Sequence, residues 1–144
     1  MAVTRSSKPF PAVKEYRMLR KISPETVFLP VPNYVGATYV KGQPNWLYIS
    51  GQVGIAKDGS CPADLKGQTG IALDNIRFML ADVGMNFDNI VKLNFFVKEG
   101  EDVDRLREAR NERMNLVPVA STIVYISGLV RDDLLVEIDC VAAG

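Results

Sequence analysis

One amphipathic helix, expected at residues 68–83, constrains the fold of this chain more than any other feature. Its apolar side chains recur at the spacing that places them on one face of a helix: Ala72, Ile76, Met79, Leu80 and Val83. Gly84 follows directly, and glycine is typical of the position just after a helix, where the backbone turns left-handed. A helix with one apolar face must cover a sheet or another helix.

The segments around this helix predict several strands and a second helix. In chain order we expect strands at 16–22, 38–40 and 46–55, the helix at 68–83, a strand at 90–97, a helix at 101–114, and strands at 121–126 and 134–141. This order predicts an α+β sandwich in which two helices cover one face of a mixed sheet. Gly51 interrupts the 46–55 strand, which indicates a bulge or a close approach of the backbone to another group.

The second face of the predicted sheet is also rich in valine, isoleucine, leucine and phenylalanine. The chain offers no further element to cover that face, and a large exposed apolar surface is unusual for a monomer. We therefore expect an oligomer whose subunits bury it.

The 144 residues fit one domain, which we place at residues 16–144 after a flexible arm at residues 1–15. The formal net charge of zero argues against nucleic acid or an anionic membrane as a partner. Residues 1–21 nevertheless carry six basic groups and one acidic group. This arm could contact a polyanion, but a solvated arm, or one packed on the acidic body, is the simpler interpretation. No apolar run is long enough for a membrane span or a signal peptide, so we expect a cytoplasmic protein.

The chain contains no histidine, which excludes several kinds of chemistry. Catalytic Ser-His-Asp and Cys-His systems are absent, and so is the usual general base for RNA cleavage. Cys61 and Cys140 match no metal-binding spacing and are expected as buried or free thiols. We expect no metal and no cofactor, so any chemistry must use carboxylates, hydroxyls, Arg, Lys, Tyr or backbone groups.

Four motifs occur in a fixed order between about residues 30 and 143. They are Tyr48-Ile49-Ser50-Gly51-Gln52, then Gln68-Thr69 with Ala72-Leu73 and Asn75-Ile76, then Gly84 with Asp88-Asn89-Ile90-Val91-Lys92, and finally Pro118-Val119-Ala120-Ser121-Thr122 with Leu135-Val136-Glu137-Ile138. Together they resemble the Rid/YjgF superfamily, whose members are also described as L-PSP endoribonuclease-like. The resemblance implies a chorismate-mutase-like fold and a homotrimer with small-molecule clefts between its subunits.

The same resemblance implies roles for two positions near the end of the chain. In the family, the arginine of a "PARST" motif clamps a substrate carboxylate, a task that suits a bidentate guanidinium. The glutamate of a later "VEI" motif holds or activates the water that hydrolyses an enamine or imine. This chain has Ala120 at the arginine position and keeps the glutamate as Glu137. Glu137 is thus the candidate catalytic residue, although a solvent-facing carboxylate would fit its strand equally well.

Other candidates for substrate binding follow from the same motifs, and each has a structural alternative. They are Tyr34, Ser50, Gly51, Ala120, Ser121, Thr122 and Arg131. Tyr34 could be a surface aromatic residue, and Ser50 and Gly51 could form only a bulge. Ser121 and Thr122 could simply favour a strand. Arg113 and Arg131 are the nearest arginines in sequence that could replace the missing cation, and solvated side chains are the simpler interpretation for both.

Two functions fit these observations best. One is a hydrolase of the imine or enamine deaminase type, acting in an intersubunit cleft on an atypical substrate because Ala120 replaces the arginine. The other is a non-catalytic small-molecule-binding or regulatory trimer with the same cleft. Ala120 favours the second function, and Glu137 favours the first. Cleavage of RNA fits least well because the chain is neutral and has no histidine.

Overall fold

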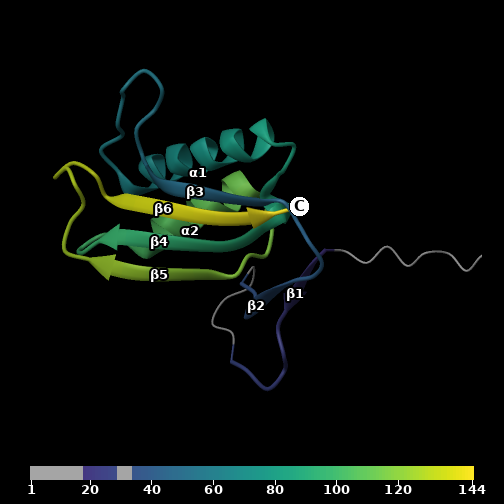
Figure 1. Ribbon diagram of the computed structural model, residues 1–144. Helices are drawn as coiled ribbons and strands as arrows, with labels where there is room; N and C mark the ends of the chain where they lie inside the picture. Colours follow the sequence, from purple (N-terminus) through teal and green to yellow (C-terminus); the bar gives the residue numbers. More distant parts are fainter. Residues whose placement is uncertain (1–17, 29–33) are drawn as a thin grey trace, which may run out of the picture.

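The computed structural model describes residues 18–28 and 34–144, and the expected N-terminal arm lies outside them. The elements, in chain order, are β1 (Leu19–Ile22), β2 (Ala37–Val40), β3 (Trp46–Val53), α1 (Leu65–Asp82), the short 3-10 helix η1 (Phe87–Asn89), β4 (Ile90–Lys98), α2 (Val103–Met114), β5 (Ser121–Ile126) and β6 (Val136–Ala143) (Figure 1). The expected α+β fold is therefore confirmed, with boundaries that differ from the sequence prediction by up to three residues.

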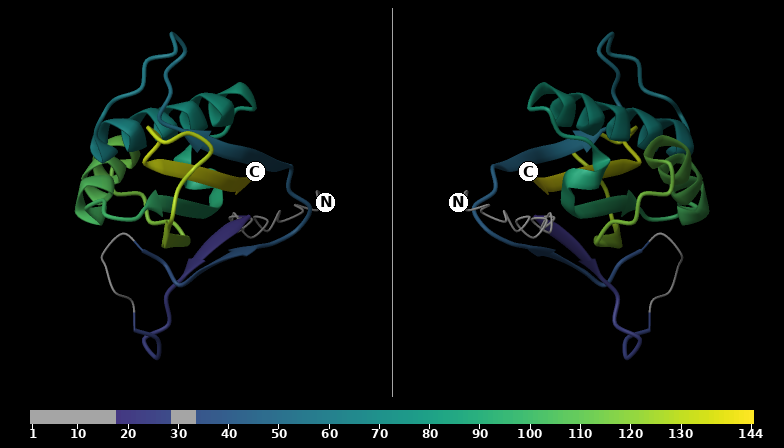
Figure 2. Two further views of the ribbon diagram at one scale, coloured as in Figure 1. Left: turned by 90° about the vertical axis from the view of Figure 1, so that its left-hand side faces the viewer. Right: turned by 90° about the vertical axis from the view of Figure 1, so that its right-hand side faces the viewer.

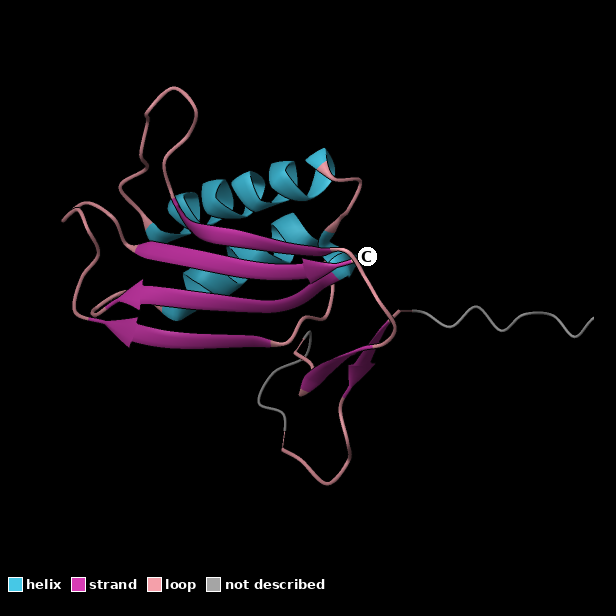
Figure 3. Cartoon of the chain, in the orientation of Figure 1, coloured by secondary structure: helices cyan, strands magenta, loops and turns pink. Residues whose placement is uncertain are grey.

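The main sheet has four strands in the order β3-β6-β4-β5. The β3–β6 and β6–β4 pairs are antiparallel, whereas β4 and β5 are parallel, so the sheet is mixed as expected. Both α1 and α2 lie on one face of this sheet, and the opposite face, called the open face below, carries no helix (Figure 2). The antiparallel β1–β2 hairpin lies beside the main sheet, near its β5 edge (Figure 3).

The core lies between the sheet and the two helices. It contains the apolar residues that alternate along β4 and β6, such as Leu93, Phe95 and Ile138, together with Ile76 and Leu80 of α1. Alternation therefore assigns the intervening residues of each strand to the open face. Neither helix in the described part of the chain has the length and apolar character needed to cross a bilayer.

Helix α1 begins and ends at recognisable capping residues. Asp64 caps its first turn, accepting a hydrogen bond from the N–H of Gly67 at 2.8 Å. At the other end Gly84 adopts a φ of 73°, and the N–H of Met85 bonds back to the carbonyl of Leu80 at 2.9 Å. This is the helix ending that the glycine predicts.

A glycine in the connection after β3 lets that connection touch α1. A Cβ atom added to Gly54 would lie 2.3 Å from Cβ and 2.5 Å from Cα of Gln68. These atoms belong to the helix itself, so they cannot move aside without shifting α1. Gly128, in contrast, has nothing within 4 Å of an added Cβ.

We expect Gly54→Ala to lower the free energy of unfolding by about 1–3 kcal/mol, since it forces β3 and α1 apart. Gly128→Ala is the matched control and should change it by less than about 0.5 kcal/mol. Urea unfolding of both variants measures the difference. Equal stability of the two variants would contradict the close contact at Gly54.

Candidate functional site

Glu137 lies on β6 with its side chain against the backbone of β3. A Cβ atom on Gly51 would meet its Oε1 at 1.8 Å and its Cδ at 2.7 Å, so only glycine leaves room for the carboxylate. The β3–β6 pairing shifts register between Ile49 and Gln52, which is the bulge that the sequence predicts at Ser50 and Gly51. The close approach expected at this glycine is therefore present, and its partner is Glu137.

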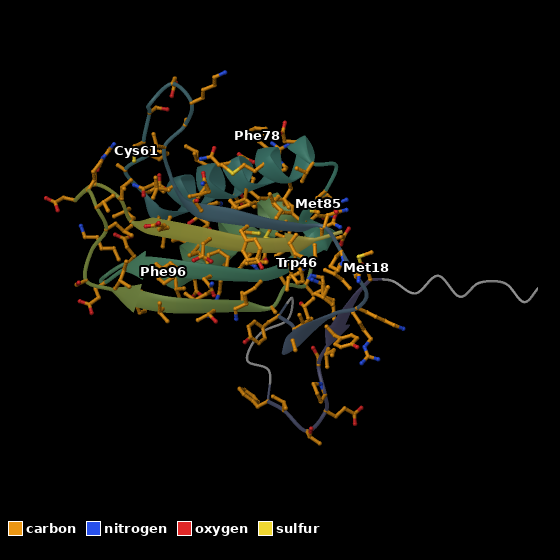
Figure 4. The ribbon with its side chains drawn as sticks, in the orientation of Figure 1. Met18, Trp46, Cys61, Phe78, Met85 and Phe96 are labelled. Atoms are coloured by element: carbon orange, nitrogen blue, oxygen red, sulfur yellow. The ribbon has the colours of Figure 1, made fainter. Side chains whose placement is uncertain are left out.

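Beside this carboxylate the open face has a depression of about 440 Å³. Apart from Glu137, its lining is apolar or glycine: Phe96, Ile126, Gly128, Leu129 and Val130. Phe96 stands directly opposite Glu137 in the β4–β6 pairing and projects from the open face (Figure 4). One carboxylate among apolar side chains is an arrangement suited to a small organic ligand.

One buried side chain holds the segment that leads into Glu137. The amide of Gln68 donates to the carbonyls of Pro62 and Asp133, both at 2.8 Å, and accepts from the N–H of Leu135 at 2.8 Å. Gln68 is completely buried, so these hydrogen bonds fix the segment before β6 to helix α1. The sequence marks this glutamine only as part of a motif, and its bonding role was not expected.

A second group of candidate residues lies at the start of β5. Tyr34 forms an isolated parallel bridge with Val119, which places its backbone next to Ala120. Ala120 is buried, with 7% of its surface exposed. Thr122 lies on the open face, whereas Ser121 is paired with the buried Leu93 and shares its core-facing side.

These two groups of residues do not meet within one chain. Glu137 pairs with Phe96, which pairs with Val124 of β5. Ala120, directly before β5, lies four residues before Val124. Strand geometry then separates the backbones at Ala120 and Glu137 by roughly 16 Å. An arginine at position 120 would not reach the carboxylate of its own subunit, so a cleft containing both positions would have to be built from two chains.

Neither arginine that the sequence suggests as a substitute cation is free to take that role in the described conformation. Arg131 forms a bidentate pair with Asp133, with Nε donating to Oδ1 at 2.9 Å. This pairing raises the pKa of Arg131 and lowers that of Asp133. Arg113 donates to Asp74 at 3.2 Å, between the two helices and away from the open face.

Lys92, which the sequence marks only as part of a motif and not as a candidate cation, lies much closer to Ala120. Lys92 of β4 is level with Ala120, the residue directly before β5, because Leu93 pairs with Ser121 and the N–H of Leu93 donates to the carbonyl of Ala120 at 3.0 Å. Its Nζ donates to Oγ1 of Thr122 at 2.9 Å. Strand pairing alone reveals this lysine, since it is distant from Ala120 in sequence.

Both cysteines are free thiols, as the sequence predicts. Cys140 lies in the core, and burial, reinforced by the nearby Asp139 carboxylate, raises its pKa to about 12. A thiol with this pKa stays protonated at neutral pH and cannot serve as a nucleophile. The described residues also hold no group of three side chains suited to binding a metal.

Comparison with known proteins identifies the family. The family model described as endoribonuclease L-PSP matches residues 26–144. The chain belongs to this family, within the Rid/YjgF superfamily.

Named relatives support the same membership. A 2-iminobutanoate/2-iminopropanoate deaminase of Escherichia coli is 32% identical over 110 residues, covering 72% of this chain and 85% of the relative. A RutC family protein of Pyrococcus horikoshii is 31% identical over 100 residues, covering 68% of this chain and 79% of the relative. The crystal structure of the Rid family protein YyfB from Yersinia pestis superimposes with a TM-score of 0.78 at 25% identity, covering 88% and 99% of the two chains.

We expect Gly51→Ala in this Rid family protein to turn the Glu137 side chain away from β3. The added methyl group would occupy the position of the carboxylate, but the end of a glutamate side chain can move, so the fold should survive with a loss of less than about 1.5 kcal/mol. A crystal structure of the variant measures the displacement. An unmoved Glu137 carboxylate in a folded variant would show that Gly51 does not determine its position.

Proposed function

We propose that the chain hydrolyses a small imine or enamine, with Glu137 as the general base. The observation that carries this proposal is the Glu137 carboxylate, which packs against Gly51 at the edge of an apolar depression. The deaminase name of the Escherichia coli relative supports the same reaction class. The substrate is atypical because Ala120 stands where the sequence resemblance places a carboxylate-binding arginine.

The reaction requires little from the protein besides a held water molecule and a base. Glu137 accepts a proton from water while the water oxygen bonds to the carbon of a protonated C=N group, whose π electrons move to nitrogen. Protonated Glu137 then passes its proton to the amine of the resulting carbinolamine. The C–N bond breaks, ammonia leaves, and the hydroxyl oxygen gives its proton back to Glu137 as the carbon becomes a carbonyl. The ammonia takes up this last proton and departs as ammonium, which restores the carboxylate. An enamine reaches the same path after protonation at carbon. The apolar lining by Phe96 and Ile126 would exclude competing water.

A second candidate function is ligand binding without turnover. Ala120 favours it, because an uncharged methyl group cannot orient a carboxylate substrate in the way that an arginine does. Titration with small 2-oxo acids separates the two functions, since binding without any imine hydrolysis would support the regulatory role. Despite the description of the family as an endoribonuclease, RNA cleavage is not proposed, because the chain has no histidine and no net positive charge.

We expect Glu137→Gln to reduce imine hydrolysis by about 10²–10⁴-fold, because it removes the base and keeps the size of the side chain. Asp139→Asn is the matched control: this carboxylate lies two residues along β6 on the same face and accepts a hydrogen bond from Asn94 at 2.8 Å. Imines released by amine and amino-acid oxidases serve as substrates, and semicarbazide captures whatever imine remains. If the Glu137→Gln variant hydrolysed imines as fast as the unmodified protein, Glu137 would be excluded as the base.

We also propose that the active form is a homotrimer whose clefts combine the Glu137 end of one subunit with the Ala120 end of another. The open face supports this assembly, since it leaves large apolar side chains such as Trp46, Tyr48 and Val124 exposed in a single chain. Light scattering at micromolar concentration should give three times the chain mass. A monomer mass would overturn the proposal.

A further inference from the structure

The loss of arginine at position 120 does not leave this end of the open face without a cation. Lys92 lies level with Ala120, the residue directly before β5, because the next residues of the two segments, Leu93 and Ser121, are paired. Paired strands lie about 4.8 Å apart. Alternation along β4 and β5 assigns Lys92 and Thr122 to the open face, and the lysine ammonium is held by Thr122, two residues from Ala120.

The bonding and the position of Lys92 together distinguish it from the other cations near the candidate site. Arg131 and Arg113 each pair with a carboxylate. Lys98 also bonds to a neutral oxygen, the carbonyl of Asp132 at 2.8 Å, but it pairs with Ile126 at the far end of β5 from Ala120. The partner of Lys92 in the described part of the chain is the neutral hydroxyl of Thr122, at 2.9 Å. An ammonium has three donors, so Lys92 keeps both its charge and further donors for an anion.

We propose that Lys92 is the anion-binding group of the cleft and that the ligand of this protein carries a carboxylate. This inference rests on the proposed function for the position of the cleft, and it names the substrate class. A lysine binds a carboxylate as a point charge, without the bidentate geometry of arginine. Thr122 contributes by holding the ammonium on the open face, two residues along from Ala120.

Isothermal titration with pyruvate and with its neutral amide, pyruvamide, tests the proposal. The unmodified protein should bind pyruvate at least about tenfold more tightly than pyruvamide, equivalent to about 1.4 kcal/mol. Lys92→Met should abolish this preference by weakening pyruvate binding and leaving pyruvamide binding unchanged. Lys57→Met, which removes an equal charge from an exposed loop, is the matched control and should keep the preference.

A second variant moves the cation from one strand to the other. In the double variant Lys92→Met with Ala120→Arg, the guanidinium extends from β5 into the space that the ammonium leaves, so the preference for pyruvate should return. Its return shows that the position of the charge, rather than a structural role of Lys92, determines carboxylate binding. The proposal would be overturned if Lys92→Met and Lys57→Met both kept the preference for pyruvate. It would also be overturned if the unmodified protein showed no preference.

The titration tests the anion site separately from the proposed reaction, because binding of pyruvate does not require catalysis. Pyruvate binding that depends on Lys92, without imine hydrolysis, would support the anion site and reject the proposed reaction. Hydrolysis of amine-derived imines that depends on Glu137, without any preference for pyruvate, would support the reaction and reject the anion site.

Discussion

The candidate site depends on one buried amide. Gln68 reaches out of α1 to bond backbone groups of Pro62, Asp133 and Leu135, and no part of it is exposed. The fully buried amide of Gln68 would cost about 1–3 kcal/mol if it were left without partners, so these hydrogen bonds keep the segments attached to the helix. Because Glu137 follows Leu135 closely on β6, the helix that stabilises the core also sets the position of the carboxylate. The rigid part of the fold and the candidate catalytic group are thus connected by two of these hydrogen bonds, those to Asp133 and Leu135.

Sequence periodicity predicted the elements better than their ends. The stop at Gly84 was correct, but the expected apolar face of α1 was correct only in part. Ala72, Ile76 and Leu80 are buried, whereas Met79 and Val83 are exposed, because the buried face of the helix runs through Leu65, Thr69 and Leu73 instead. The helix also begins at Leu65, three residues before the expected start, because Asp64 caps it through a side-chain bond that periodicity does not reveal. The last strand was expected at 134–141 and runs from Val136 to Ala143. Its final alanines belong to the strand because they pair with β3, a long-range contact that local composition cannot indicate.

The candidate site was predictable in part. A glycine inside a strand correctly indicated a close approach, and the structure supplies Glu137 as the group that approaches. The substitute cation was sought among arginines near Ala120 in sequence, and this search was misleading. Arg131 lies two residues from its partner Asp133, and such a short separation favours a local ion pair over a distant ligand. Lys92 became visible only through the register of β4 and β5, which the sequence does not specify.

The open face carries both apolar and charged groups, and this mixture limits how another subunit could cover it. Exposed aromatic side chains such as Trp46 and Tyr48 favour burial. Lys92 and Glu137 oppose it, since removing an isolated charge from water costs several kcal/mol unless an opposite charge or good hydrogen bonds compensate. Within one chain these two charged groups lie about four residues apart along the strands and cannot compensate each other. An interface that buries the aromatic side chains while leaving both charges at a water-filled gap satisfies both requirements, and such a gap would present a cation and a carboxylate to the same small molecule.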